Sequence, residues 1–151
     1  MYKKILIPTD GSPLSATAIA QGVALAKSVG AKVMGLTVSA PFHTFALDPT
    51  MVSDTKETYK KDCEERAAKY LGVIKTAASA AGVPCEVTHV NAEHPYEGII
   101  DTAKTAGCDL ILMASHGRRG ASALILGSET VKPVSDQPKT PSPKQRTQTG
   151  R

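Results

Sequence analysis

The sequence predicts an α/β fold: an open, doubly wound parallel sheet with helices on both faces. The first observation is that short apolar runs alternate with longer segments of helical periodicity, in the order β-α-β-α-β-α-β. This alternation is typical of parallel sheets joined by right-handed crossovers. The second observation is that polar or glycine-rich residues directly follow two of the apolar runs. Ligands of such sheets bind at this edge, outside the carboxyl ends of the strands.

The first strand is expected at residues 3–8, where a short apolar run has the composition of a buried parallel strand. The helix that follows has clear signals at both ends. Ser12 can cap it, Pro13 suits its first turn, and Gly30 suits its end. Residues 32–39, rich in aliphatic side chains, are predicted to form the second strand.

The longest helical pattern covers residues 53–81, in which apolar side chains recur every three or four positions and so share one face. Gly82 ends this helix. A third strand at residues 85–90 and a helix at residues 96–106 continue the alternation. The fourth strand is expected at residues 109–114, where the run is again apolar.

The net charge of +4 belongs to residues 132–151, which hold five basic residues and one acidic residue. Residues 1–131 therefore hold 13 basic and 13 acidic residues. A nucleic-acid partner calls for a basic surface on the folded domain, so this balance argues against one. Residues 132–151 are also rich in proline and poor in apolar side chains, which predicts a disordered tail after a single domain at residues 1–131.

Cellular location is predicted from three absences in the sequence. The cysteines, Cys63, Cys85 and Cys108, are odd in number and widely spaced, which favours neither a disulfide framework nor a cysteine-rich metal site. No apolar run is long enough to span a bilayer, and the N-terminus has no pattern of an export signal. We therefore expect a cytoplasmic protein with no membrane partner.

The most informative segment follows the fourth predicted strand, at residues 114–120, and continues to Gly127 and Ser128. A glycine-rich loop leaves backbone N–H groups uncovered, and these can donate to phosphate oxygens. The second glycine and its hydroxyl neighbour would complete this cradle. Asp10 ends the first strand and would face the same crevice if the first and fourth strands are neighbours. The pattern predicts a phosphate site and, by extension, a nucleotide.

Over about residues 2–131 the chain resembles the universal stress protein family. The segments that carry the resemblance are Lys4-Ile5-Leu6-Ile7-Pro8-Thr9-Asp10-Gly11-Ser12 and Met113-Ala114-Ser115-His116-Gly117-Arg118-Arg119-Gly120. The ATP-binding branch of that family has the pattern G-x2-G-x9-G-[ST]. Here Ala114 takes the first position and Gly117 the second, and nine residues then lead to Gly127 and Ser128.

The resemblance implies strand order 3-2-1-4-5, with ATP at the carboxyl edge and Mg²⁺ or Mn²⁺ bridging its phosphate oxygens. Pro8, Thr9 and Asp10 would lie near the adenine and ribose, and Val38 would contact the base. The residues expected around the phosphates are Gly117, Gly127, Ser128, Glu129 and Thr130. Ala114 adds one methyl group to a position where the family has glycine, and we expect it to weaken binding rather than abolish it.

Two residues of the loop allow two interpretations each. His116 is either an acid or base near a phosphate or a polar loop residue, and the second is favoured because no partnered nucleophile is visible. Arg118 either neutralises phosphate charge or points into solvent. The chain has neither a P-loop motif nor G-x-G-x-x-G at its first helix. We therefore expect no catalytic residue and at most slow hydrolysis.

The C-terminal segment departs from the family, which continues into a fifth, apolar strand that commonly forms the dimer edge. Residues 132–138 have no such pattern, so we expect strand order 3-2-1-4 with the fourth strand exposed, and a weakened homodimer. The expected function is that of an ATP-binding switch module in stress response. One alternative is a nucleotide-free interaction protein, disabled at Ala114. Another is a slow ATP-cleaving enzyme that uses Asp10 and His116.

Overall fold

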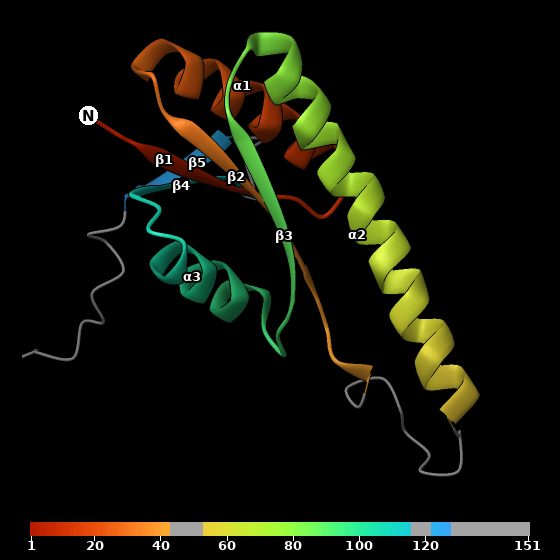
Figure 1. Cartoon of the computed structure of the whole chain (residues 1–151). Coiled ribbons are helices and arrows are strands. Elements are labelled where there is room, and N and C mark those ends of the chain that lie inside the picture. Colours follow the sequence, from red (N-terminus) through yellow and green to blue (C-terminus); the bar gives the residue numbers. More distant parts are fainter. Residues whose placement is uncertain (43–52, 116–121, 128–151) are drawn as a thin grey trace, which may run out of the picture.

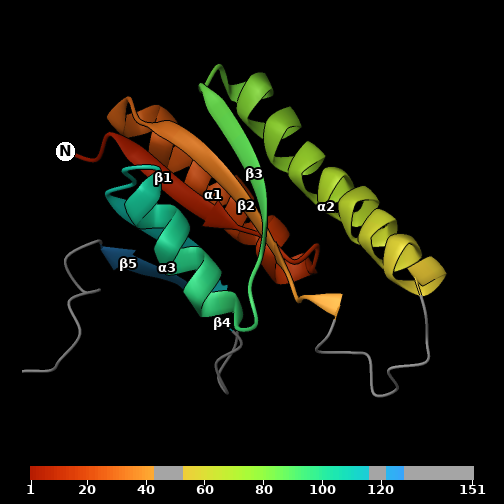
Figure 2. The same cartoon turned by 60° about the horizontal axis from the view of Figure 1, so that its bottom comes forward.

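The computed structural model describes residues 1–42, 53–115 and 122–127 of the chain. Its elements, in chain order, are β1 (Lys4–Pro8), α1 (Pro13–Val29), β2 (Lys32–Ser39), α2 (Ser53–Ala81), β3 (Cys85–Asn91), α3 (Pro95–Thr105), β4 (Leu110–Ser115) and β5 (Ser122–Gly127). The strands form one sheet in the order β3-β2-β1-β4-β5. Figures 1 and 2 show α1 and α2 on one face of this sheet and α3 on the other.

The four parallel strands confirm the predicted α/β class and the predicted order 3-2-1-4. Strand β1 lies at the centre, and its residues Ile5, Leu6 and Ile7 are fully buried. Because side chains alternate along a strand, Ile5 and Ile7 join the core under α1 and α2, whereas Leu6 joins the core under α3. Both faces of the sheet are therefore covered, as the continuous apolar runs predict.

Helix α1 begins and ends at the predicted residues. The Oγ atom of Ser12 accepts a hydrogen bond from the backbone N–H of Ser15, at 3.2 Å, and Gly30 closes the helix with φ of 70°. The helix lies close to the sheet at Gly22, where a Cβ atom would stand 2.5 Å from Cδ1 of Ile7. A larger residue at this position would push α1 away from β1.

Helix α2 covers the predicted residues 53–81 and has two different halves. The C-terminal half packs on β2 and β3 through buried residues such as Leu71, Ile74 and Ala78. The N-terminal half continues past the carboxyl end of β2 (Figure 1). In the described part of the chain, neither α2 nor any other helix is long and apolar enough to cross a membrane.

Strand β4 is not the exposed edge that the sequence predicts. Strand β5 pairs with it in the antiparallel direction, from Leu110 opposite Gly127 to Ser115 opposite Ser122. The sequence prediction places residues 122–127 in the phosphate loop, although they include the apolar run Ala-Leu-Ile-Leu. Pairing satisfies the backbone groups of β4 that an open edge would leave to solvent. Residues 132–138, in which the family would have its fifth strand, lie outside the described residues.

Candidate functional site

A cavity of about 240 Å³ opens at the carboxyl ends of β1, β2 and β4. Its lining residues are Pro8, Thr9, Asp10, Ser12, Ser15, Leu36, Val38, Pro95, Ile99, Met113 and Ala114. Five of these are sequence-predicted site residues: Pro8, Thr9, Asp10, Val38 and Ala114. They meet because β2 and β4 lie on opposite sides of β1, which makes the end of β1 the switch point of the sheet.

Asp10 brings a negative charge to this cavity. Its Oδ1 atom accepts hydrogen bonds from the backbone N–H of Ser12, at 2.9 Å, and from the Oγ–H of Ser15, at 2.8 Å. Hydrogen bonds from Ser12 and Ser15 lower the pKa of the Asp10 carboxyl, outweighing the opposing effect of partial burial. Among the described residues no hydrogen bond engages Oδ2, so this atom remains available to a ligand.

The turn between β1 and α1 is held from two sides. The backbone N–H of Thr9 donates to the carbonyl of Leu36, at 2.8 Å, and the Thr37 hydroxyl donates to the carbonyl of Thr9, at 3.2 Å. From the other side, the ring of Tyr70 on α2 covers Gly11, whose φ is +76°. These contacts fix the direction in which Asp10 leaves the sheet.

The remaining wall of the cavity is apolar. Val38 and Leu36 contribute from β2, Met113 from β4, and Ile99 from α3. Helix α3 lies close to β2 because it has glycine at position 98, where a Cβ atom would stand 3.0 Å from Val38. A planar ring could lie against this wall, while the carboxylate of Asp10 provides polar contacts at its rim.

Several lining residues were not predicted from the sequence: Ser12, Ser15, Leu36, Pro95, Ile99 and Met113. The sequence does contain patterns that place some of these residues at the cavity. Ser15 follows the capping Ser12 by three positions, which is the spacing at which the two side chains meet. Pro95 and Ile99 reach the cavity because the crossover from β3 to β4 carries α3 across the face of β2. The handedness of that crossover is predictable in principle.

The structure differs from the prediction at Gly127. Because β5 is antiparallel, Gly127 lies opposite Leu110, whose partner in β1 is Ile5. Thr9 and Asp10 follow the other end of β1. The predicted grouping of Gly127 with Asp10 is therefore not found, and Gly127 lies toward the opposite edge of the sheet.

Other predicted residues of the phosphate segment lie outside the described residues: His116, Gly117, Arg118, Ser128, Glu129 and Thr130. Within the described ranges, no three His, Cys, Asp or Glu side chains are grouped so that they could hold a metal ion.

Comparisons with known proteins bear on these observations. Residues 1–139 match the model of the universal stress protein family. The chain belongs to the universal stress protein family. It is 30% identical over 136 residues to the universal stress protein YxiE of Bacillus subtilis, with 87% of this chain and 91% of the relative covered. It is 31% identical over 138 residues to a universal stress protein of Thermus aquaticus, with coverages of 91% and 95%.

Solved structures of universal stress proteins share the fold. The structure of MJ0577, a universal stress protein of Methanocaldococcus jannaschii, superposes with a TM-score of 0.66 at 29% identity, covering 78% of this chain and 77% of that one. A universal stress protein in complex with cAMP gives a TM-score of 0.51 at 21% identity, covering 74% and 71%. A family protein of Arabidopsis thaliana with AMP bound gives 0.51 at 16% identity, covering 71% and 72%.

Proposed function

We propose that this universal stress protein binds ATP, with Mg²⁺ or Mn²⁺ on its phosphates, and acts as a nucleotide-dependent switch in stress response. The observation that carries the proposal is the meeting of the Asp10 carboxylate with the apolar wall at Val38 in one cavity. Support also comes from the family, in which one structure holds cAMP and another holds AMP.

The cavity suits the nucleoside part of the ligand. The free Oδ2 atom of Asp10 can accept hydrogen bonds from the ribose hydroxyls, and hydrogen bonds to a carboxylate are stronger than neutral ones. The adenine ring would lie against Leu36, Val38 and Ile99. At about 240 Å³ the cavity is smaller than the roughly 300–1,000 Å³ of typical ligand sites. The triphosphate would therefore extend beyond it.

The charge state of Asp10 argues for binding rather than fast catalysis. A general base works best when its pKa lies near the working pH. Because the hydrogen bonds from Ser12 and Ser15 lower the pKa of Asp10, its carboxylate is a weak base at neutral pH. When bound, the metal would neutralise phosphate charge, and the protein's part is to orient the nucleoside. We expect hydrolysis to be far slower than one turnover per second, a low value for enzymes.

Calorimetric titration with ATP and MgCl₂ tests the proposal. In Asp10→Ala the ribose hydroxyls lose an ionised acceptor, and we expect the dissociation constant to rise about 10- to 100-fold. The matched control is Asp62→Ala, which removes the same charge from an exposed position on α2. Equal affinities of the two variants, or no heat at millimolar ATP in the unmodified protein, would refute the assignment.

We also propose a cytoplasmic location and a weak homodimer. In the described part of the sheet, β5 forms the edge on the side of β4, and β4 itself lies inside the sheet. An outermost strand leaves backbone groups able to pair with a second copy. Sedimentation measured over a 100-fold range of protein concentration tests this association. A protein that stays monomeric over the whole range would contradict it.

A further inference from the structure

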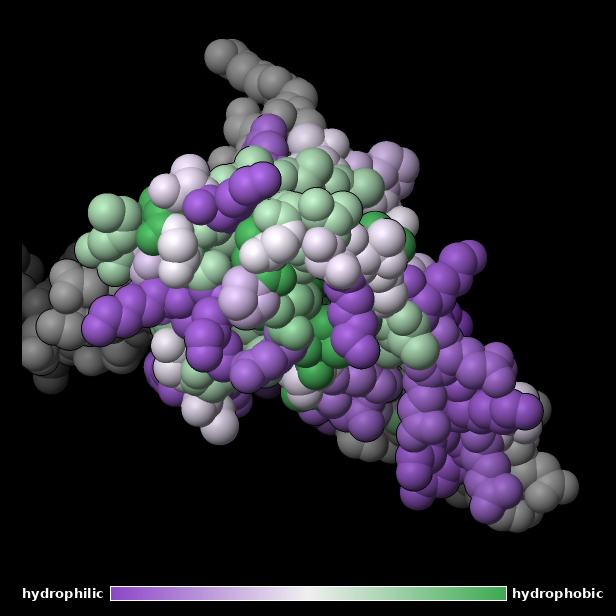
Figure 3. Space-filling view, turned by 45° about the horizontal axis from the view of Figure 1, so that its top comes forward, coloured by the Kyte–Doolittle hydropathy of each residue, from purple (hydrophilic) through white to green (hydrophobic). Residues whose placement is uncertain are grey.

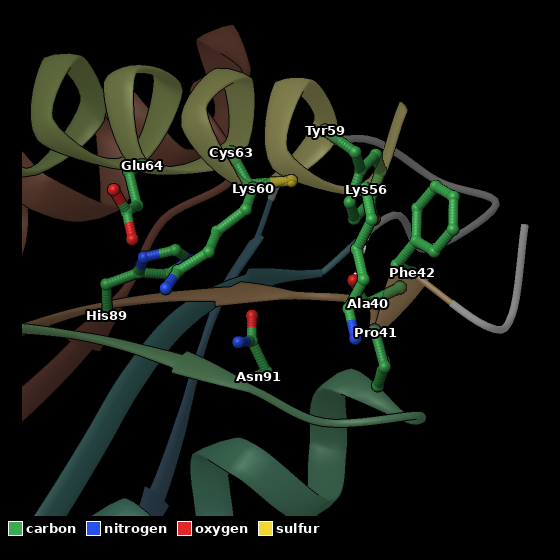
Figure 4. Close-up of a pocket in the computed structure, with 10 residues that line it drawn as sticks. All are labelled: Ala40, Pro41, Phe42, Lys56, Tyr59, Lys60, Cys63, Glu64, His89 and Asn91. Atoms are coloured by element: carbon green, nitrogen blue, oxygen red, sulfur yellow. Dashed lines mark hydrogen bonds between the residues drawn. The ribbon is translucent and has the colours of Figure 1, made fainter. Parts of the chain in front are cut away.

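A second and larger cavity, of about 480 Å³, lies between the N-terminal half of α2 and the carboxyl ends of β2 and β3 (Figure 4). None of its lining residues lines the cavity around Asp10. The two are therefore separate hollows on the same edge of the sheet. Its volume falls within the range of about 300–1,000 Å³ that small-molecule sites occupy.

One wall of this cavity is aromatic and preformed. The rings of Phe42 and Tyr59 lie 5.5 Å apart between centroids, tilted by 56°. The hydroxyl of Tyr59 donates a hydrogen bond to the carbonyl of Ala40, at 2.7 Å, which joins α2 to the end of β2. Aromatic rings bind planar ligands through their large apolar faces. A ring-shaped ligand would find this surface in place before it binds.

The floor of the cavity is polar. His89 and Asn91 stand two residues apart on β3, so their side chains point to the same face, toward α2 (Figure 4). The Nε2 atom of His89 is hydrogen-bonded to Oγ of Ser39, at 2.8 Å, which fixes the orientation of the ring. The side-chain amide of Asn91 has N–H groups that can donate to an anion.

The rim of the cavity is positively charged, although the helix that forms it is neutral. Residues 54–69 contain five acidic and five basic side chains. Hydrophilic side chains cover this half of α2, at the lower right of Figure 3. Two lysines, Lys56 and Lys60, line the cavity against a single carboxylate, Glu64. Among the described residues, neither lysine has an ion-pair partner within 4.0 Å.

We propose that this cavity binds a small organic monoanion with a planar ring, of which an aromatic carboxylate is the simplest example. The ring would lie against Phe42 and Tyr59, and the carboxylate would lie between the ammonium groups of Lys56 and Lys60. The Asn91 amide would add a hydrogen bond. Because Glu64 offsets one of the two lysines, a single negative charge fits the cavity better than a triphosphate does.

Titration of the full chain with salicylate tests this proposal, by calorimetry at low salt and by amide NMR. We expect saturable binding, with amide resonance shifts at Ala40, Phe42 and residues 89–91 and none at Thr9 or Asp10. Shifts centred on Thr9 and Asp10 would instead overturn the proposal. So would the absence of saturation at about 10 mM salicylate. Salicylate binding must also persist in Asp10→Ala, which separates this proposal from the proposed ATP site.

A charge-matched pair of variants makes the test specific. The double variant Lys56→Gln/Lys60→Gln should raise the dissociation constant for salicylate about tenfold, because each exposed ion pair contributes modestly. The control Lys61→Gln/Lys69→Gln removes two charges from exposed positions that do not line the cavity. This control should leave the dissociation constant for salicylate unchanged. Salicylamide, the neutral analogue, should bind the unmodified protein about tenfold more weakly. Equal losses in both double variants, or equal binding of the two compounds, would overturn the proposal.

Discussion

Gly11 is the residue at which the turn after β1 has the least room for a side chain. Its φ of +76° lies in the left-handed region, which costs a non-glycine residue about 1–2 kcal/mol. A Cβ atom there would stand 2.2 Å from Cε1 of Tyr70 and 2.5 Å from Cζ. Carbon atoms in favourable contact lie about 3.5–4.0 Å apart. Gly11→Ala must therefore displace the Tyr70 ring or the turn itself.

The cost of this substitution follows from adding the two effects. Overpacking a well-filled site typically costs about 1–3 kcal/mol, so Gly11→Ala should lower the free energy of unfolding by about 2–5 kcal/mol in total. Gly30→Ala is the matched control. Gly30 has nearly the same φ, +70°, but no atom lies within 4 Å of the position its Cβ would take. Gly30→Ala should therefore lower the free energy of unfolding by only about 1–2 kcal/mol.

Urea denaturation followed by circular dichroism measures both losses. The double variant Gly11→Ala/Tyr70→Ala closes a thermodynamic cycle, and removal of the ring should recover most of the excess cost of the methyl group. Equal losses in Gly11→Ala and Gly30→Ala would refute the reasoning, because they would show that Tyr70 does not restrict the turn. The same would follow if the two substitutions of the double variant had strictly additive effects.

Three further predictions concern single side chains. Asp109 accepts hydrogen bonds from the backbone N–H groups of Lys3, at 2.8 Å, and Lys4, at 3.1 Å. Asp109→Ala should therefore lower the free energy of unfolding by about 1–2 kcal/mol in urea, whereas the exposed Asp101→Ala should change it by less than about 0.5 kcal/mol. The folded-state pKa of Asp10 is lowered by its serine partners, so its stabilisation is complete above the unfolded pKa of about 3.9 and is lost as pH falls through the lower folded value. The stability difference between the unmodified protein and Asp10→Asn should thus be largest near neutral pH and shrink in acid; a difference that grows in acid would contradict this. Ala114→Gly should tighten ATP binding measured by calorimetry, and unchanged affinity would show that the Ala114 methyl group does not limit the approach of the nucleotide.

Features set by local sequence could be predicted well. Helix α2 occupies residues 53–81 as expected, because its apolar side chains recur with the helical period over many turns. Residues 32–39 form β2 as expected, and the Ser12 and Gly30 caps lie where the sequence places them. In each case the signal lies within a few residues of the element that it defines.

Features set by distant contacts could not be predicted in the same way. Residues 122–127 form a short apolar run, and periodicity cannot decide whether such a run is a strand, a loop or part of a helix. Its pairing with β4 decides the outcome and carries Gly127 away from Asp10. The contact between Tyr70 and Gly11 joins residues 59 positions apart, and no local pattern announces it. Likewise, Ile99 reaches the cavity only because α3 crosses the face of the sheet.

One face of α2 connects the two candidate sites. A third hollow, of about 230 Å³, lies between them: it shares Asp10 and Val38 with the first cavity and Tyr59 with the second. Tyr70, which covers Gly11 in the turn directly after Asp10, lines this hollow as well. The proposed carboxylate ligand would bind against a Tyr59 ring that is already held in place, so it should leave Tyr70 and the turn around Asp10 where they are. Coupling between two sites is reciprocal, so saturating ATP should in turn leave the affinity for salicylate unchanged.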